Sequence, residues 1–162
     1  MVLRRRETYL SGSGIHRFHQ ERLLTAASPS ASLNAGGSGL AFEDLAIAQR
    51  ASLSRMVAEG DLPFRTGEPL RSGQPIACGL WILGLVAEVL GTRLPGPGAV
   101  LLTQTNQFLA PVEAGDVVTA GVEVVELVPA RGRARLFCEC VCDGRPVFEG
   151  EAWVALERRA RA

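Results

Sequence analysis

The longest apolar stretch of the chain lies near its middle and has the length of a helix. Residues 79–90 have the sequence GLWILGLVAEVL, and Glu88 is the only charged side chain among them. A surface helix of a globular protein keeps a polar face, so a helix without one must be buried on nearly all sides. The pattern therefore predicts a buried central helix over 79–90 that begins at Gly79 and is followed by Gly91.

The C-terminal half alternates apolar and polar residues with a period of two, which is typical of half-buried β-strands. We predict strands over 99–112, 117–128, 134–144 and 146–157. Asp143-Gly144 is a strong signal for a hairpin turn. Because a sheet with one apolar face needs a cover, we expect it to pack on the helix at 79–90. These elements predict an α+β fold with an antiparallel sheet around one apolar helix.

The first part of the chain has a weaker pattern. Residues 1–40 are rich in Ser, Gly, Ala and Arg, and we interpret them as an N-terminal extension and linker before a single domain over 41–158. Residues 45–60 have apolar side chains at helical spacing, which predicts a helix. Residues 61–75 carry three prolines and two glycines, which predicts a long surface loop of the kind that often forms the wall or lid of a site.

Composition excludes several classes of function. The 162 residues have a formal net charge of zero, so we expect neither nucleic acid nor an anionic membrane as a partner. The chain contains no lysine, which excludes a Schiff base with pyridoxal phosphate, and we expect no cofactor. No apolar run is long enough to span a membrane, and no apolar segment of a signal peptide follows the basic N-terminus. We therefore expect a cytoplasmic location.

Three of the four cysteines have a spacing that suggests a metal site. Cys138, Cys140 and Cys142 alternate along a predicted strand. Alternate residues of a strand lie roughly 6.5–7 Å apart, whereas thiolates that share one zinc, each about 2.3 Å from it, must lie closer together. We therefore predict reduced cysteines that pack in the core, and no metal.

A series of short motifs runs from Pro75 to Val125. It comprises Pro75-Ile76-Ala77-Cys78-Gly79, Leu90-Gly91, Leu94-Pro95-Gly96-Pro97-Gly98, Gln104 and Phe108, Pro111-Val112, and Gly115-Asp116. In order and spacing this series resembles the MaoC-like (R)-specific enoyl-CoA hydratases. The resemblance implies a single hotdog domain, in which a curved antiparallel sheet wraps around the central helix, and a homodimer. It also implies an acyl thioester substrate, carried on CoA or on an acyl-carrier protein.

By this resemblance the start of the central helix is the site of the thioester. A helix N-terminus has unpaired N–H groups and a partial positive charge, and a glycine there lets a carbonyl approach closely. Gly79 is therefore the candidate donor to an enolate-like oxyanion. The resemblance further implies a substrate-binding set made of Cys78, Leu80, Trp81 and Gly98.

The catalytic pair of the family is missing from the pattern. The hydratases carry an Asp and, five residues later, a His, which position and deprotonate the water. Counting back from Gly79 without gaps places Met56 and Asp61 at these two positions, and a gapped alignment places Gly60-Asp61 on the family's Gly-Asp. Neither alignment supplies a histidine. Asp61 remains the candidate catalytic carboxylate, with an exposed loop aspartate as the alternative.

Each of the other polar candidates for the site also has a purely structural explanation. The only histidines, His16 and His19, precede the linker, and we interpret them as surface residues unless this arm reaches the site. Cys78 is more readily explained as a neighbour of the helix start than as a nucleophile, although a helix N-terminus lowers a thiol pKa. Glu88 either pairs at a subunit boundary or faces the pocket.

Three functions remain open at this stage. The first, favoured by the family likeness, is a hydratase or dehydratase in which Gly79 polarises the thioester and Asp61 moves the proton, for instance in polyketide or other secondary-metabolite biosynthesis. The second is a hotdog thioesterase in which Asp61 activates water. The third is a non-catalytic binding subunit that has lost the catalytic pair.

Overall fold

The computed structural model describes residues 39–61 and 76–159. The chain divides into two compact units, Met1–Ser32 and Leu33–Ala162, and every described residue belongs to the second. Residues 1–38 of the predicted extension over 1–40, with its two histidines, and residues 62–75 of the predicted loop over 61–75 lie outside the described residues. The domain limits of 41–158 therefore stay a prediction.

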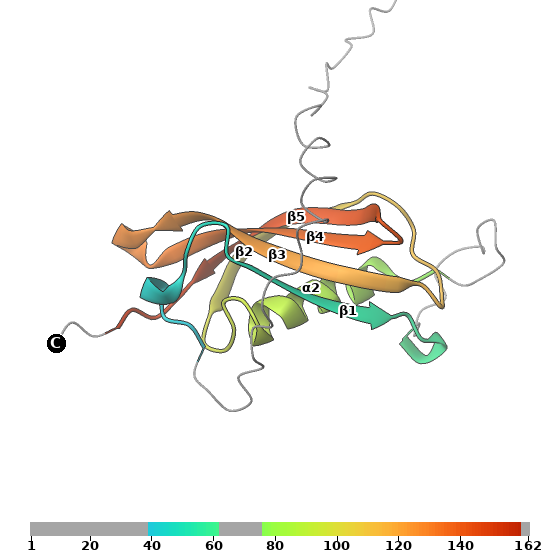
Figure 1. Ribbon diagram of the computed structural model, residues 1–162, viewed down its shortest axis with the longest axis horizontal. Helices are drawn as coiled ribbons and strands as arrows, with labels where there is room; N and C mark the ends of the chain where they lie inside the picture. Colours follow the sequence, from blue (N-terminus) through green and yellow to red (C-terminus); the bar gives the residue numbers. More distant parts are fainter. Residues whose placement is uncertain (1–38, 62–75, 160–162) are drawn as a thin grey trace, which may run out of the picture. The chain divides into compact units, whose positions relative to one another are not determined.

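One long helix and five strands make up the described part of the chain (Figure 1). The helix is α2 (Gly79–Thr92). The strands are β1 (Arg50–Met56), β2 (Val100–Phe108), β3 (Val117–Val128), β4 (Arg133–Cys142) and β5 (Arg145–Ala155). Short 3-10 helices lie in the connections: η1 (Phe42–Asp44), η2 (Glu59–Asp61) and η3 (Pro129–Arg131).

The five strands form one antiparallel sheet in the order β1-β3-β4-β5-β2. The β3–β4 and β4–β5 connections are tight, because Gly132, Asp143 and Gly144 adopt the positive φ that such turns require. β1 and β2 are the edges of the sheet. In Figure 1, α2 lies against one face of this sheet, so the predicted α+β arrangement is confirmed.

The core lies between α2 and the inward face of the sheet. α2 contributes the buried side chains Ile82, Leu85, Val86, Val89 and Leu90. Alternate residues of the strands meet them, as the period of two requires; on β3 these are Val118, Ala120, Val122 and Val124. No helix among the described residues is long and apolar enough to cross a bilayer.

The three cysteines of β4 belong to this core, as predicted. Cys138, Cys140 and Cys142 are buried, and none forms a disulfide. Burial raises the pKa of both Cys138 and Cys140 to about 12. These thiols therefore stay protonated and behave as small apolar side chains.

The predicted helix over 45–60 is wrong. Residues Arg50–Met56 form the strand β1, which pairs with β3 in a register that places Leu53 opposite Ala120. The sequence RASLSRM fits a period of two as well as a helical one, and so short a run leaves the two ambiguous. The free edge of β3 resolves the ambiguity in favour of a strand, since pairing outweighs local propensity.

The other predicted elements are confirmed with shifted ends. α2 continues two residues further than expected, to Thr92. The predicted strand over 99–112 ends early, at Phe108, because the chain leaves β5 before Pro111. The segment after this strand forms part of the candidate site.

Candidate functional site

The N-terminus of α2 is held against the segment that follows β2. Ala77 donates its backbone N–H to the carbonyl of Val112 at 2.8 Å, and Ile76 forms an isolated antiparallel bridge with Glu113. Cys78, the N-cap residue, has extended backbone angles, and its side chain makes no capping hydrogen bond. Backbone contacts thus fix the position of the helix start, while no side chain of the N-cap covers it.

The first two N–H groups of α2 have no acceptor among the described residues. The first turn of a helix lacks intrahelical acceptors, and only the N–H of Trp81 is satisfied locally, by the carbonyl of Cys78 at 3.0 Å. The N–H groups of Gly79 and Leu80 remain, at the positive end of the helix dipole. This helix end can therefore donate hydrogen bonds to an oxygen that carries negative charge.

An open pocket of about 420 Å³ adjoins the same helix end. Two segments line it, the start of α2 and the chain that follows β2, with the residues Ala77, Gly79, Ile82, Phe108, Leu109, Ala110, Pro111 and Val112. None of these residues has a charged or polar side chain. The lining suits an alkyl group, and the helix N–H groups beside it suit a polar oxygen on that group.

Gly79 and Phe108 lie close together in this pocket. A Cβ added to Gly79 would lie 2.7 Å from Cζ of Phe108. The Phe108 ring packs at a tilt of 55° on Phe148, with ring centroids 5.5 Å apart, and Phe148 is fully buried. The glycine at the start of α2 therefore makes room for the tip of the Phe108 ring.

Asp61 lies at the end of η2, shortly before the loop that leads to α2. Its Oδ2 accepts the backbone N–H of Ala58 at 3.1 Å, and its own N–H donates to the carbonyl of Ala58. One carboxylate oxygen thus stabilises the local turn. Met56, which the ungapped alignment places at the position of the family's Asp, is the last residue of β1 and is exposed. The catalytic role of Asp61 stays a prediction.

The predicted substrate-binding residues fall into two places. Cys78 and Leu80 flank Gly79 at the helix start, and Leu80 is 70% exposed. Trp81 is half-buried and packs on the core. Gly98 lies beyond the other end of α2, a helix about 20 Å long, and lines a different pocket. Its role in substrate binding stays a prediction.

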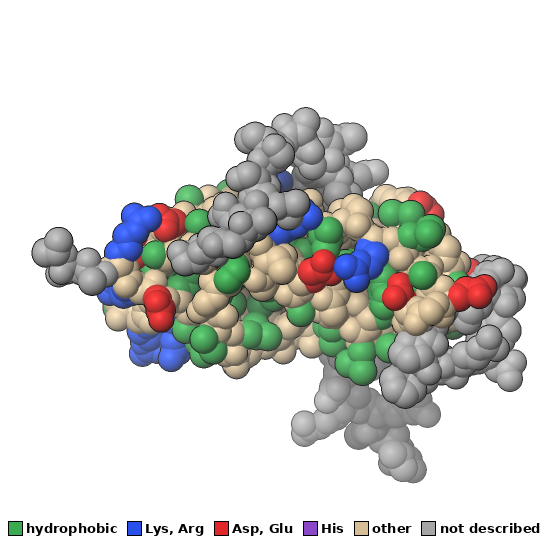
Figure 2. Space-filling model, turned by 90° about the horizontal axis from the view of Figure 1, so that it is seen from below, with side chains coloured by type: hydrophobic (Ala, Val, Ile, Leu, Met, Phe, Trp, Pro, Cys, Tyr) green, Lys and Arg blue, Asp and Glu red, His purple; other side chains and the backbone are tan. Residues whose placement is uncertain are grey.

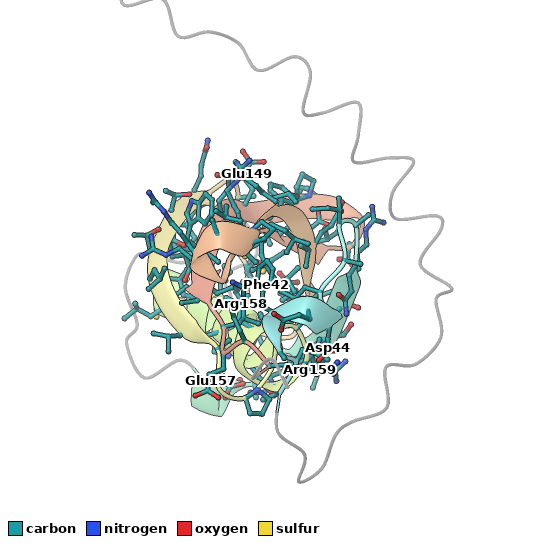
Figure 3. All side chains as sticks on the ribbon, turned by 90° about the vertical axis from the view of Figure 1, so that its left-hand side faces the viewer. Phe42, Asp44, Glu149, Glu157, Arg158 and Arg159 are labelled. Atoms are coloured by element: carbon teal, nitrogen blue, oxygen red, sulfur yellow. The ribbon has the colours of Figure 1, made fainter. Side chains whose placement is uncertain are left out.

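That second pocket, of about 440 Å³, lies where η1 meets the C-terminal segment (Figure 3). Arg159 pairs with Asp44 at 2.6 Å, and Arg158 pairs with Glu43 at 3.3 Å. Arg158 also lies over the ring of Phe42. Both guanidinium groups have carboxylate partners, so we interpret this pocket as a structural junction, although it is slightly larger than the one at Gly79.

One group of side chains in the described part of the chain has the spacing of a metal site. Potential ligand atoms of Asp116, Cys142 and Asp143 lie within 4.8 Å of one another. However, Oδ2 of Asp116 already accepts the N–H of Glu113, and burial raises the pKa of Cys142 to about 11. A protonated thiol is a poor ligand, and we assign no metal to this group.

Sequence reasoning missed part of the pocket. One of the two predictions for Glu88 was that its side chain faces the pocket. Glu88 instead pairs with Arg55 of β1 at 2.8 Å. The lining by Ile82 and by the segment Leu109–Val112 was not anticipated. Its only signal was the motif Gln104, Phe108 and Pro111-Val112, which does not reveal that the chain turns there to face the helix start.

Comparisons with known proteins place this geometry in context. No protein-family model matches the chain. The chain is 41% identical over 138 residues to the 3-hydroxybutyryl-CoA dehydratase of Methylorubrum extorquens, covering 76% of this chain and 88% of the relative. It is 37% identical over 133 residues to the (R)-specific enoyl-CoA hydratase of Rhodospirillum rubrum, covering 73% and 92%. Among solved structures, the unliganded R-hydratase PhaJ1 of Pseudomonas aeruginosa matches with a TM-score of 0.68 at 26% identity, covering 75% of this chain and 88% of that one.

Proposed function

This chain belongs to the MaoC-like family of hotdog-fold enoyl-CoA hydratases and dehydratases, and from this we propose that it interconverts an enoyl-CoA and the corresponding 3-hydroxyacyl-CoA. The observation that carries the proposal is the uncapped N-terminus of α2 beside a wholly apolar pocket. The acyl chain occupies the pocket, and the thioester carbonyl lies at the helix end.

Gly79 acts on the carbonyl. Its N–H donates to the thioester oxygen and stabilises the negative charge that develops there as the enolate forms. In hydration, the oxygen of water bonds to the β-carbon and a proton is added to the α-carbon; dehydration reverses both steps. One well-placed donor of this kind contributes a factor of about 10²–10³ in rate.

We assign the proton transfer to Asp61. Among the described residues, only Oδ2 of this carboxylate is hydrogen-bonded, so Oδ1 can accept a proton from water. General base catalysis by a positioned carboxylate supplies about 10²–10⁴ in rate, and no histidine is needed for the proton balance. This assignment makes the site a single-carboxylate variant of the family.

We infer that the active form is a dimer of two copies of the chain. The edge strand β2 exposes Val100, Leu101 and Leu102, each at least 40% accessible, and an apolar edge of this kind invites pairing with another strand. Antiparallel pairing of β2 with its own copy satisfies a two-fold axis. The face that carries α2 also shows exposed apolar side chains (Figure 2).

The test of the function is an assay of the full-length protein with crotonyl-CoA, 3-hydroxybutyryl-CoA and butyryl-CoA. Enoyl absorbance and free thiol are followed in the same run, for the wild type and for Asp61→Asn. We expect a change in enoyl absorbance that is about 10²-fold slower in the variant. The matched control is Glu59→Gln, which changes the other carboxylate of η2 and should retain the wild-type rate.

The remaining outcomes separate the alternatives. Thiol release without an enoyl change would replace the hydratase by a thioesterase. Neither signal with any substrate would leave a non-catalytic subunit. An Asp61→Asn variant as active as the wild type would remove Asp61 from the mechanism and leave the role of Gly79 standing.

A further inference from the structure

We propose that the Phe108 ring shields the carbonyl site at Gly79 from water and turns the positively polarised edge of the ring toward the thioester oxygen. The inference rests on the proposed function, because it assumes that the thioester carbonyl lies at the start of α2. It adds a second residue to that site, which acts by covering the carbonyl and not by donating a hydrogen bond to it.

The tip of the Phe108 ring lies over the end of α2. Apart from the adjoining residues and the backbone of the helix itself, the three heavy atoms closest to a Cβ built on Gly79 are Cζ, Cε1 and Cε2 of this ring, at 2.7, 2.9 and 3.2 Å. In a helix the Cα–Cβ direction tilts toward the N-terminus, and the free N–H groups of the first turn point the same way. The ring tip therefore lies on the side to which the Gly79 N–H points.

This position makes the ring tip a neighbour of the bound oxygen. An oxyanion lies about 3 Å from the nitrogen that donates to it, and the Gly79 nitrogen is one bond from the Cα beside the ring tip. Cζ and the two Cε atoms form the outer edge of the ring, which carries partial positive charge, whereas the faces carry partial negative charge. The edge therefore favours an oxygen on which negative charge develops.

The ring also forms the boundary between the helix end and solvent. Phe108 is 49% exposed, and Phe148, on which it packs with ring centroids 5.5 Å apart, is fully buried. Leu109 is 37% exposed but supplies none of the three atoms nearest to Gly79. Removal of water from the carbonyl site strengthens the hydrogen bond from the Gly79 N–H to the oxygen, because the local dielectric constant falls.

The helix start is held in place without the ring. Ala77 donates its backbone N–H to the carbonyl of Val112 at 2.8 Å, which ties the chain before Gly79 to the segment after β2. The backbone of Phe108 is held by its pairing with Phe148 across β2 and β5. A shorter side chain at Phe108 therefore removes the cover and leaves the Gly79 N–H where it is.

The test is infrared spectroscopy of the full-length protein with butyryl-CoA that carries carbon-13 at the thioester carbonyl. We expect the carbonyl stretching band of the ligand bound to the wild type to lie below that of the free thioester in water. In Phe108→Ala the band should move at least halfway back, because water reaches the carbonyl. The kcat for crotonyl-CoA should fall about tenfold, a part of the 10²–10³ that a whole donor supplies.

The matched control is Leu109→Ala, which removes apolar surface from the same pocket. It should raise the Kd for butyryl-CoA and leave the carbonyl band at the wild-type position. Phe108→Leu keeps a shorter apolar side chain without the aromatic edge and should give an intermediate band. Calorimetry with butyryl-CoA shows for each variant that the site is folded and occupied.

The outcomes that contradict the inference are distinct from those that contradict the proposed function. A Phe108→Ala protein that binds butyryl-CoA with the wild-type band overturns the role of Phe108 alone, and so does an equal shift in Leu109→Ala. Loss of binding in both Phe108 variants makes Phe108 a binding residue and overturns the shield. A wild type that does not bind butyryl-CoA, or binds it without a lowered band, overturns the carbonyl site at Gly79 as well.

Discussion

Gly79 combines two features of the candidate site. Its N–H lies at the start of α2, where the N-cap side chain makes no hydrogen bond, and the tip of the Phe108 ring occupies the space that a side chain on Gly79 would need. A side chain at this position would affect the proposed carbonyl site and the acyl pocket together. Because the contact involves the outer end of an exposed ring, the ring can move and the fold can adapt.

The contact between Gly79 and Phe108 can be measured by a double-mutant cycle. We expect Gly79→Ala to destabilise the wild type more than it destabilises the Phe108→Ala variant, because only the wild type has a ring at 2.7 Å from the new Cβ. The coupling should be at least about 0.5 kcal/mol in the free energy of unfolding, as for residues in direct contact.

The control for this cycle is Gly91→Ala near the C-terminus of α2. A Cβ there meets no atom within 4 Å, so the change should stabilise both backgrounds equally, by up to about 1 kcal/mol from helix propensity. Equal effects of Gly79→Ala in the two backgrounds would show that the ring does not press on the helix start.

At the scale of elements, α2 and the three strands β3, β4 and β5 could be predicted from the sequence because their signals are local. α2 is apolar on nearly every face, and turn residues such as Gly132 and Gly144 separate the strands. The strand β1 could not be predicted from the sequence, because its conformation depends on pairing with β3, some seventy residues away in the chain. No periodicity in a seven-residue segment contains that information.

In the candidate site, too, local features could be predicted from the sequence and features that depend on long-range pairing could not. The uncapped helix start at Gly79 could be predicted from the motif around it. The pocket could not, because its far wall is built by Phe108 and the segment up to Val112, which reach the helix start only through the register of β2 on β5. The physical cause is again a long-range pairing.

The buried thiols of β4 predict a pH dependence of stability. Burial raises the pKa of Cys138 and Cys140 from 9.0 to about 12. Between these pH values the folded thiol keeps its proton and the unfolded one loses it, so stability is full below pH 9 and falls as the pH rises toward 12. Each thiol contributes a slope of at most about 1.4 kcal/mol per pH unit.

Urea unfolding of Cys138→Ala and the wild type between pH 8 and 11 measures this slope. The variant should lose stability at pH 8 through lost packing and then decline less steeply than the wild type. Val122→Ala, at a buried position of β3 opposite Cys138, removes packing but no titrating group and should keep the wild-type slope. Parallel curves for wild type and Cys138→Ala would contradict the raised thiol pKa.

At the scale of the whole molecule, most exposed large apolar side chains of the described residues lie on β2 or directly after it, and α2 exposes a row of mostly small residues. β2 exposes Val100, Leu101 and Leu102 along an unpaired edge. On α2, the outward positions Leu80, Gly84, Ala87 and Gly91 are exposed, and a Cβ at either glycine meets no neighbour within 4 Å. Small residues at helical spacing leave space for a second helix to approach closely.

The proposed dimer can therefore be disrupted on α2 without disturbing the fold of one chain. We expect the wild type to sediment with twice the 17.2 kDa of a single chain, and Ala87→Arg to sediment as a monomer, because the large charged side chain occupies the face offered to the second copy. Ala130→Arg, an equivalent change at an exposed position of η3, should remain dimeric.

Because Leu80 and Gly79 belong to the same helix, the monomeric variant should also bind butyryl-CoA more weakly. An Ala87→Arg protein that stays dimeric would place the interface elsewhere, and a monomeric wild type would remove the dimer from the proposal.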